Sequence, residues 1–183
     1  MPELQLRMVR PNLDHLPEIN IPEEYELRTY FPGDESAWCD IMNTGIGDGW
    51  TPERCKNELT MLDSFMPDGC FFVTRSESRE IVATACAWRN LPNGVIVPKG
   101  VVNPATVHMV CAKPNHRGRG LGYLTTLAVL HYMLDQGYKS AFLGTDDFRV
   151  PAIKTYLRLG FVPEYLADDH RKRWSSIFAK LPA

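Results

Sequence analysis

A strand-like apolar segment that runs into a glycine-rich turn and then into a helical pattern most constrains this chain. It spans residues 107–122 and reads V-H-M-V-C-A-K-P-N-H-R-G-R-G-L-G. The first N–H groups of a helix have no partners within the helix, and the helix dipole favours negative charge beside them. Glycines in the turn remove the Cβ atoms that would keep phosphate oxygens away from the backbone. The turn therefore predicts a site for a diphosphate-bearing cofactor.

The spacing of the glycines separates this turn from two common nucleotide motifs. A nucleotide P-loop requires G-x-x-x-x-G-K-[ST], and neither Lys-Ser nor Lys-Thr follows these glycines. The dinucleotide fingerprint requires G-x-G-x-x-G, whereas the spacing here is G-x-G-x-G. The pattern that fits is R-x-x-G-x-G, formed by Arg117, Gly120 and Gly122. Arg117 and Arg119 add charge-assisted donors for phosphate oxygens.

The R-x-x-G-x-G pattern resembles the acyl-CoA signature of the GNAT superfamily of N-acyltransferases. A second segment, R-V-P-A-I-K-T-Y-L-R-L-G-F over residues 149–161, resembles the superfamily's recurring N-x-x-A-x-x-x-Y-x-x-x-G-F. Arg149 stands where Asn is more usual. The residues on the expected register are Ala152, Tyr156, Gly160 and Phe161. Two motifs in the right order, separated by one helix and one strand, support the same resemblance.

Composition excludes several classes of protein. With 183 residues, 44% of them hydrophobic and 23% charged, the chain matches an ordinary soluble domain. The net charge of −2 gives no overall attraction to nucleic acid or membranes. The N-terminus lacks the apolar core of a signal peptide, and no apolar run approaches the ~18 residues of a membrane span. Five cysteines without a C-x-x-C pair and five histidines without ligand spacing favour reduced cytoplasmic thiols and no metal.

The order of elements predicts an N-terminal arm and one mixed α/β domain. Residues 1–22 are proline-rich with little periodicity, so we expect an arm that wraps the domain or frays, and a single domain over 23–183. The patterns predict strands at 24–30, 70–74, 81–88, 106–112, 139–144, 161–166 and 173–181, and helices at 34–43, 52–65, 119–136 and 150–159. The resemblance implies a GNAT-like central sheet, mostly antiparallel with one splayed parallel pair, and helices on both faces.

The resemblance also implies an activity and a co-substrate. It predicts an N-acetyltransferase that moves the acetyl group of acetyl-CoA to a primary amine of a small molecule. The strand before the turn would place the amide of Val110 at the thioester oxygen and the backbone of Cys111 and Ala112 along the pantetheine arm. The residues implied at the pyrophosphate are Arg117, Gly118, Arg119, Gly120, Leu121, Gly122 and Tyr123.

Two side chains are candidates for proton transfer. The resemblance makes Tyr156 the donor to the CoA sulfur, which suits a phenol with a pKa of ~10. His108 stands two residues before Val110, so we expect both on one face of the strand. A histidine with a pKa of ~6.5 can take the proton of the attacking amine. A water chain can do the same, and His108 can instead be a core residue.

Arg149 and the acceptor site are less constrained. Arg149 either contacts CoA or forms an ion pair with Asp146 or Asp147 beside it. Acceptor contacts should come from the glycine-rich loop 44–50 and from residues 168–174, although the second segment can equally be a solvated turn. The acceptor candidates are Asp48, Trp50, His170 and Trp174.

Two functions stay open at this level. One is an acetyl-CoA-dependent enzyme with a small-molecule amine acceptor. The other is a catalytically inactive CoA-binding regulatory or interaction module on the same fold. The presence of Tyr156 together with the complete R-x-x-G-x-G pattern favours the enzyme. We expect a cytoplasmic protein without nucleic acid or membrane partners, and a homodimer is compatible with the sequence.

Overall fold

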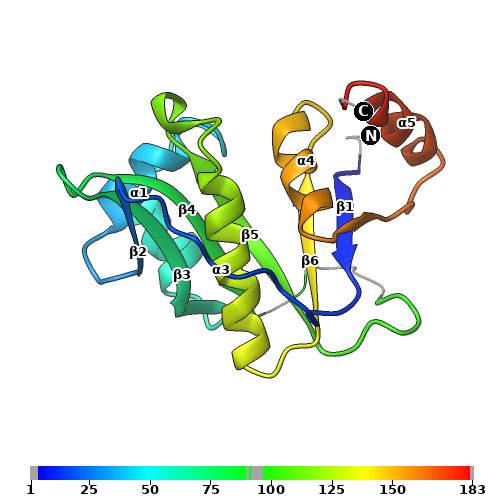
Figure 1. Ribbon diagram of the computed structural model, residues 1–183, viewed down its shortest axis with the longest axis horizontal. Helices are drawn as coiled ribbons and strands as arrows, with labels where there is room; N and C mark the ends of the chain where they lie inside the picture. Colours follow the sequence, from blue (N-terminus) through cyan, green and yellow to red (C-terminus); the bar gives the residue numbers. More distant parts are fainter. Residues whose placement is uncertain (1–3, 90, 92–96, 182–183) are drawn as a thin grey trace.

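In the part of the chain that the structure describes, seven strands form one sheet with helices on both faces (Figure 1). The computed structural model describes residues 4–89, 91 and 97–181. The strands are β1 (Leu6–Arg10), β2 (Tyr25–Thr29), β3 (Phe65–Arg75), β4 (Ile81–Trp88), β5 (Pro104–Ala112), β6 (Ser140–Thr145) and β7 (Val162–Pro163). The α-helices are α1 (Glu35–Met42), α2 (Pro52–Cys55), α3 (Leu121–Asp135), α4 (Val150–Arg158) and α5 (His170–Phe178).

Two shorter helical segments complete the fold. The π-helical segment η1 (Lys56–Thr60) continues α2, and the 3₁₀ turn η2 (Pro114–His116) precedes α3. The strand order is β2-β3-β4-β5-β6-β1-β7. β5 and β6 pair in parallel, and the other neighbours pair antiparallel. This confirms the expected mostly antiparallel sheet with one parallel pair. No helix among the described residues is long and apolar enough to cross a bilayer.

Side chains along each strand point alternately to the two faces of the sheet, and this divides the core between the two faces. Ala85 of β4 lies in a core cluster with Leu127 of α3 and residues of α4, and we call this side the α3/α4 face. Cys86, the next residue, lies in a second cluster with Trp38 of α1 and Cys55 of α2, on the α1/α2 face. Successive strand residues point to opposite faces, which explains the division. All five cysteines are free, buried and part of this second cluster.

Residues 6–10 differ from the expected arm, because they form the strand β1 between β6 and β7. Every residue of β1 is buried. Arg7 forms an ion pair with Glu164, and Arg10 donates a hydrogen bond to the carbonyl of Leu159. The two arginines give this buried strand the composition of a polar segment. The hydrophobic periodicity of the sequence therefore did not indicate a strand here. From residue 11 the chain crosses the outer side of α3 before it enters β2 (Figure 1).

The expected strand over 173–181 is wrong, because residues 170–178 form the helix α5. His170, Trp174 and Ile177 follow the i, i+4, i+7 spacing of one helix face, and all three are buried. Trp174 Nε1 also donates to the carbonyl of Glu164 at 3.2 Å. The aromatic and branched residues of this segment favour strands by composition, but their spacing suits a helix.

The other expected elements are present, with different boundaries in three places. The helix expected to reach residue 65 ends as η1 at Thr60. The strand expected at 70–74 begins earlier, because residues 67–69 lie inside β3, where the pairing with β4 is irregular between Phe65 and Cys70. The strand expected at 161–166 is reduced to β7. Between the strands expected at 81–88 and 106–112, residues 90 and 92–96 lie outside the described residues.

Candidate functional site

β5 and β6 diverge after a short parallel ladder, and the gap between them forms a cleft. Their residue pairs are Pro104–Ser140, Ala105–Ala141 and Thr106–Phe142. Beyond Thr106, the edge of β5 toward β6 has no strand partner in the described sheet, so its backbone groups can bind another extended chain. The cleft has a volume of about 170 Å³. Its walls contain Gln5, Ile46, Val107, His108, Met109, Val110, Gly144, Thr145, Asp146, Arg149 and Tyr156.

A bulge in β5 turns His108 and Val110 to opposite faces of the sheet. The pairs on either side of the bulge are Cys86–His108 and Thr84–Cys111. Two residues of β5 therefore lie opposite the single residue Ala85 of β4. Met109, inside the bulge, has a φ of 50°, in the left-handed region. The expectation that residues 108 and 110 share a face is wrong, because the extra residue breaks the two-residue period.

The cleft opens to both faces, with a different side chain on each. On the α3/α4 face, Val107 belongs to the same core cluster as Tyr156, and Val110 packs against it. On the α1/α2 face, the His108 ring packs edge-on against Trp88 with ring centroids 5.3 Å apart. The phenol and the imidazole thus reach one cleft from opposite sides.

Tyr156 is held in the cleft by α4, the first helix after β6. Its side chain is 5% exposed and packs edge-on against Phe161, with ring centroids 6.1 Å apart. Burial raises the pKa of Tyr156, and the Arg149 guanidinium opposes that rise. The phenol is therefore neutral and keeps its proton under ordinary conditions.

Burial lowers the pKa of His108 from its ordinary value to about 4. Removal from water disfavours the charged imidazolium, so the ring is neutral at neutral pH and carries a free lone pair. The same surroundings would make a protonated ring short-lived. The lowered pKa also makes the ring a weaker base than an exposed histidine, so a proton that it accepts must pass on to solvent.

Gly118 and Gly120 bring the backbone of the turn against open space. Their φ values are 75° and 77°, a region that glycine adopts without strain. Apart from the adjoining residues and the backbone of α3 itself, no heavy atom of the described residues lies within 4 Å of a Cβ built at either position or at Gly122. Gly120 is the N-cap of α3, so the first-turn N–H groups of Leu121, Gly122 and Tyr123 lack partners within the helix. The geometry is suited to an anion.

The two arginines of the turn make different contacts. Arg117 donates from Nε to the carbonyl of Ala112 at 3.1 Å and from Nη2 to the carbonyl of Thr44 at 2.8 Å. These bonds tie the end of β5 to the loop after α1. Arg119 donates to the Tyr25 hydroxyl at 3.3 Å, and half of its side chain is exposed. Arg119 therefore breaks fewer hydrogen bonds than Arg117 when it turns toward an anion.

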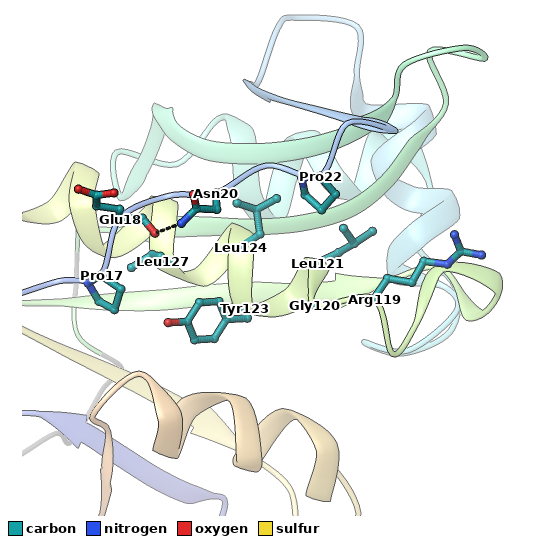
Figure 2. A pocket seen from close by; sticks show the side chains of 10 residues that line it. All are labelled: Pro17, Glu18, Asn20, Pro22, Arg119, Gly120, Leu121, Tyr123, Leu124 and Leu127. Atoms are coloured by element: carbon teal, nitrogen blue, oxygen red, sulfur yellow. Dashed lines mark hydrogen bonds between the residues drawn. The ribbon is translucent and has the colours of Figure 1, made fainter.

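Figure 2 shows a second cavity, of about 340 Å³, between the first turns of α3 and the N-terminal segment that crosses them. Proline and leucine side chains supply much of its lining, with Glu18 near one end and Arg119 near the other. The lining residues are Pro17, Glu18, Asn20, Pro22, Arg119, Gly120, Leu121, Tyr123, Leu124 and Leu127. The cavity begins at the glycine turn, so it adjoins the expected pyrophosphate residues. Nothing in the sequence pattern pointed to the residues of 17–22.

Cys111 and Ala112 offer only their backbone to a ligand in the cleft. The Cys111 thiol turns to the α1/α2 face and lies 3.5 Å from the carbonyl oxygen of Ile41. The carbonyl of Ala112 already accepts a hydrogen bond from Arg117. Both residues pair with β4 on their other side.

Arg149 forms one of the two contacts expected for it. Its Nε donates to Asp146 Oδ2 at 2.8 Å, while Asp147 pairs with Arg173 instead. Its Nη1 donates to the carbonyl of Gly45 at 2.7 Å. Arg149 thus connects the end of β6 to the loop after α1, at the rim of the cleft.

None of the four acceptor candidates is among the side chains that line the cleft. Asp48 is exposed, and its carbonyl accepts a hydrogen bond from Arg54 at 3.1 Å. Trp50 is 8% exposed and lies under the Arg54 guanidinium, 4.2 Å from the ring centroid. His170 and Trp174 are completely buried. This differs from the expectation for both, because α5 turns them into the core rather than toward an acceptor.

Gln5, Gly144, Thr145 and Asp146 also line the cleft, although none of them is a predicted site residue. A Cβ at Gly144 would lie 2.5 Å from Gln5 Oε1, so the glycine makes room for the glutamine. Gln5 Nε2 donates to Asp146 Oδ1 at 3.3 Å. The signal available was the Gly-Thr-Asp run at the carboxyl end of β6, since ligands of α/β sheets bind at the carboxyl ends of parallel strands.

A family model described as Acetyltransferase (GNAT) family matches residues 35–161. The match includes β5, the glycine turn, α3, β6 and α4. Among solved structures, a GCN5-related N-acetyltransferase from Sphaerobacter thermophilus has the same fold, with a TM-score of 0.67 and 21% identity. That alignment covers 88% of this chain and 50% of the other.

Curated relatives give a closer sequence match. The mycothiol acetyltransferase of Thermomonospora curvata is 32% identical over 172 residues, which cover 89% of this chain and 52% of that protein. The mycothiol acetyltransferase of Tsukamurella paurometabola is 34% identical over 166 residues, with coverages of 85% and 54%. The chain spans about half the length of the curated relatives it matches.

Proposed function

The chain belongs to the acetyltransferase (GNAT) family, and from that premise we propose that it transfers the acetyl group of acetyl-CoA to a primary amine of a small molecule. The cleft through the sheet carries the proposal, with Tyr156 on one face and His108 on the other. Acyl transfer requires an acid at the leaving group and a base at the nucleophile. A module that only binds CoA needs neither group.

Acetyl-CoA enters from the α3/α4 face in this proposal. The free N–H groups at the start of α3 bind the pyrophosphate, and the nucleotide portion occupies the adjoining cavity beside Arg119. The pantetheine arm pairs with the unpaired edge of β5 from Ala112 to Val110. The N–H of Val110 then donates to the thioester oxygen. Arg117 holds the loop after α1 in place, and Arg149 shapes the rim.

In the proposed reaction, each face of the cleft supplies one of the two proton-transfer groups. The amine nitrogen attacks the thioester carbon, a carbon–nitrogen bond forms and the carbon–sulfur bond breaks. The N–H of Val110 stabilises the negative charge that develops on the carbonyl oxygen. Tyr156 gives its proton to the departing thiolate and regains one from solvent. His108, or a water molecule beside it, takes the proton that the amine loses.

The acceptor approaches from the α1/α2 face, where polar groups rim the cleft. The Asp146 carboxylate is 34% exposed and receives hydrogen bonds from Arg149 and Gln5. Asp146 lines the cleft, so its carboxylate can orient the ammonium group of the acceptor. Asp48 is a second exposed carboxylate, in the 44–50 loop. The small volume of the cleft and the name of the curated relatives both support a small-molecule acceptor.

A thiol-release assay tests the proposal. Purified protein is mixed with acetyl-CoA and a panel of small primary amines, and free CoA is followed with a thiol reagent. We expect release that depends on one class of amine, with the N-acetylated product identified by mass spectrometry. Tight binding of acetyl-CoA without amine-dependent release across the panel would support the binding module instead.

A further inference from the structure

Thr145, the last residue of β6, has a buried hydroxyl group without a hydrogen-bond partner. The residue is 2% exposed, and within the described part of the chain nothing pairs with its Oγ1. Buried hydroxyl groups in folded proteins are nearly always hydrogen-bonded to protein or to ordered water. Thr145 also lines the cleft between β5 and β6. An unpaired hydroxyl in that wall indicates a partner that arrives with the ligand.

Thr145 lies across the cleft from the bulge that contains Val110. The last parallel pair of the two strands is Thr106–Phe142. Thr145 is three residues beyond Phe142, and the same advance along β5 from Thr106 reaches Met109, next to Val110. Parallel strands rise by nearly the same distance per residue, so the two positions are level.

The hydroxyl belongs to the same face of the sheet as Tyr156. Ala141 and Leu143, on alternate positions before Thr145, lie in the core cluster that contains Tyr156. The partner of Thr145 in β1 is Leu6, which also belongs to that cluster. Thr145 therefore faces the side from which acetyl-CoA enters in the proposed function.

We propose that Thr145 is a positioning residue whose hydroxyl hydrogen-bonds the pantetheine amide nearest the thioester. The inference rests on the proposed binding of acetyl-CoA. Val110 takes the thioester oxygen and Tyr156 the sulfur, so the next polar group along the arm is this amide. A hydroxyl can donate to the amide carbonyl or accept from its N–H. Fixing the amide keeps the thioester carbon in line with the attacking amine.

Thr84 provides a matched control for this test. Its hydroxyl is also buried and without a partner among the described residues, and the residue is 0% exposed. Thr84 alternates with Ala85, so it lies on the α1/α2 face with Cys86 and does not line the cleft. Thr84→Val removes the same chemical group from a place that acetyl-CoA does not reach.

The test measures Kd by calorimetry for two probes, acetyl-CoA and adenosine 3′,5′-bisphosphate, which lacks the pantetheine arm. We expect Thr145→Val to weaken acetyl-CoA binding about tenfold, the loss of one hydrogen bond, and to leave the bisphosphate unchanged. Thr145→Ser, which keeps the hydroxyl, should bind acetyl-CoA like the wild type, and so should Thr84→Val. The Tm of Thr145→Val should not fall, because the change removes an unpaired polar group.

Four outcomes separate the possibilities. An unchanged Kd for acetyl-CoA in Thr145→Val overturns the role of the hydroxyl. Equal weakening of both probes also overturns it, because that result indicates a general distortion of the site. If Thr145→Val does not fold, Thr145→Ala compared with Thr145→Ser carries the same test. A wild-type protein that does not bind acetyl-CoA contradicts the proposed function itself.

Discussion

At the scale of single residues, burial holds both proton-transfer candidates in their neutral forms. It raises the pKa of Tyr156 and lowers that of His108 to about 4. A neutral phenol can donate a proton and a neutral imidazole can accept one, so each group is in the form that its proposed role requires. The cleft thus offers an acid on one face and a base on the other at the same pH.

Tyr156→Phe should lower kcat by roughly 10²–10⁴-fold, because the departing thiolate loses its proton donor. The Kd for acetyl-CoA should barely change, since the ring and its packing against Phe161 remain. Thiol release and calorimetry measure the two quantities. Tyr132→Phe is the control, because Tyr132 is a partly buried tyrosine of α3 outside the cleft. Wild-type turnover in Tyr156→Phe would make Tyr156 a structural residue.

His108→Gln should lower kcat/KM and also change how stability depends on pH. An unfolded histidine has a pKa of ~6.5, above the folded value of about 4, so the unfolded chain binds more protons between these values. The contribution of His108 to the free energy of unfolding is therefore complete above the pKa of the unfolded state. It is lost as the pH falls toward the pKa of the folded state. The loss is on the order of 3 kcal/mol in the free energy of unfolding.

Denaturant titrations at several pH values compare the wild type with His108→Gln, which lacks this contribution. A variant with the parental kcat/KM would show that His108 is not the base and that water or another group takes the proton. An identical pH dependence of stability in both proteins would contradict the lowered pKa.

At the scale of elements, the start of α3 and the open edge of β5 form the proposed acetyl-CoA site. The strand at 106–112, the helix at 119–136 and the helix at 150–159 could be predicted, because glycines and apolar periodicity mark their limits. The bulge at Met109 could not, since it depends on how β5 pairs with β4. The face on which His108 lies could not be predicted either, because the bulge places His108 and Val110 on opposite faces.

Gly120→Glu should abolish acetyl-CoA binding and leave a folded protein. The new carboxylate would occupy the open space at the N-cap of α3 and repel the phosphates. Gly137→Glu is the matched control at the other end of the helix, because Gly137 has a φ of 84° and equally open surroundings. Both variants carry the same backbone strain, so calorimetry with acetyl-CoA isolates the site. Equal affinity in the two variants would contradict a pyrophosphate site at this turn.

At the scale of the whole molecule, the cleft is assembled from segments far apart in the chain. Gln5 from the N-terminal segment reaches Asp146 after β6, and Arg7 of β1 pairs with Glu164. Contacts between such distant positions leave no local pattern, which is why β1 and the place of Gln5 in the cleft could not be predicted. The buried His170 and Trp174 are a different case, because their spacing suits a helix face but the composition of the segment favours a strand.

Removal of residues 1–10 should therefore prevent folding, although the sequence suggested an arm that wraps the domain or frays. β1 lies between β6 and β7, and its loss exposes Leu143 and the other apolar residues on β6. Circular dichroism and thermal unfolding compare the truncated and complete chains. A truncated chain with the Tm of the complete protein would contradict a structural role for β1.

A crystal structure of the protein with CoA tests the central claim most directly, because it places both ends of the ligand. We expect the pyrophosphate on the N–H groups of Leu121–Tyr123 and the sulfur in the cleft between β5 and β6, within hydrogen-bonding distance of the Tyr156 hydroxyl. A pyrophosphate bound away from the start of α3, or a sulfur outside the cleft, would contradict acetyl transfer at this site.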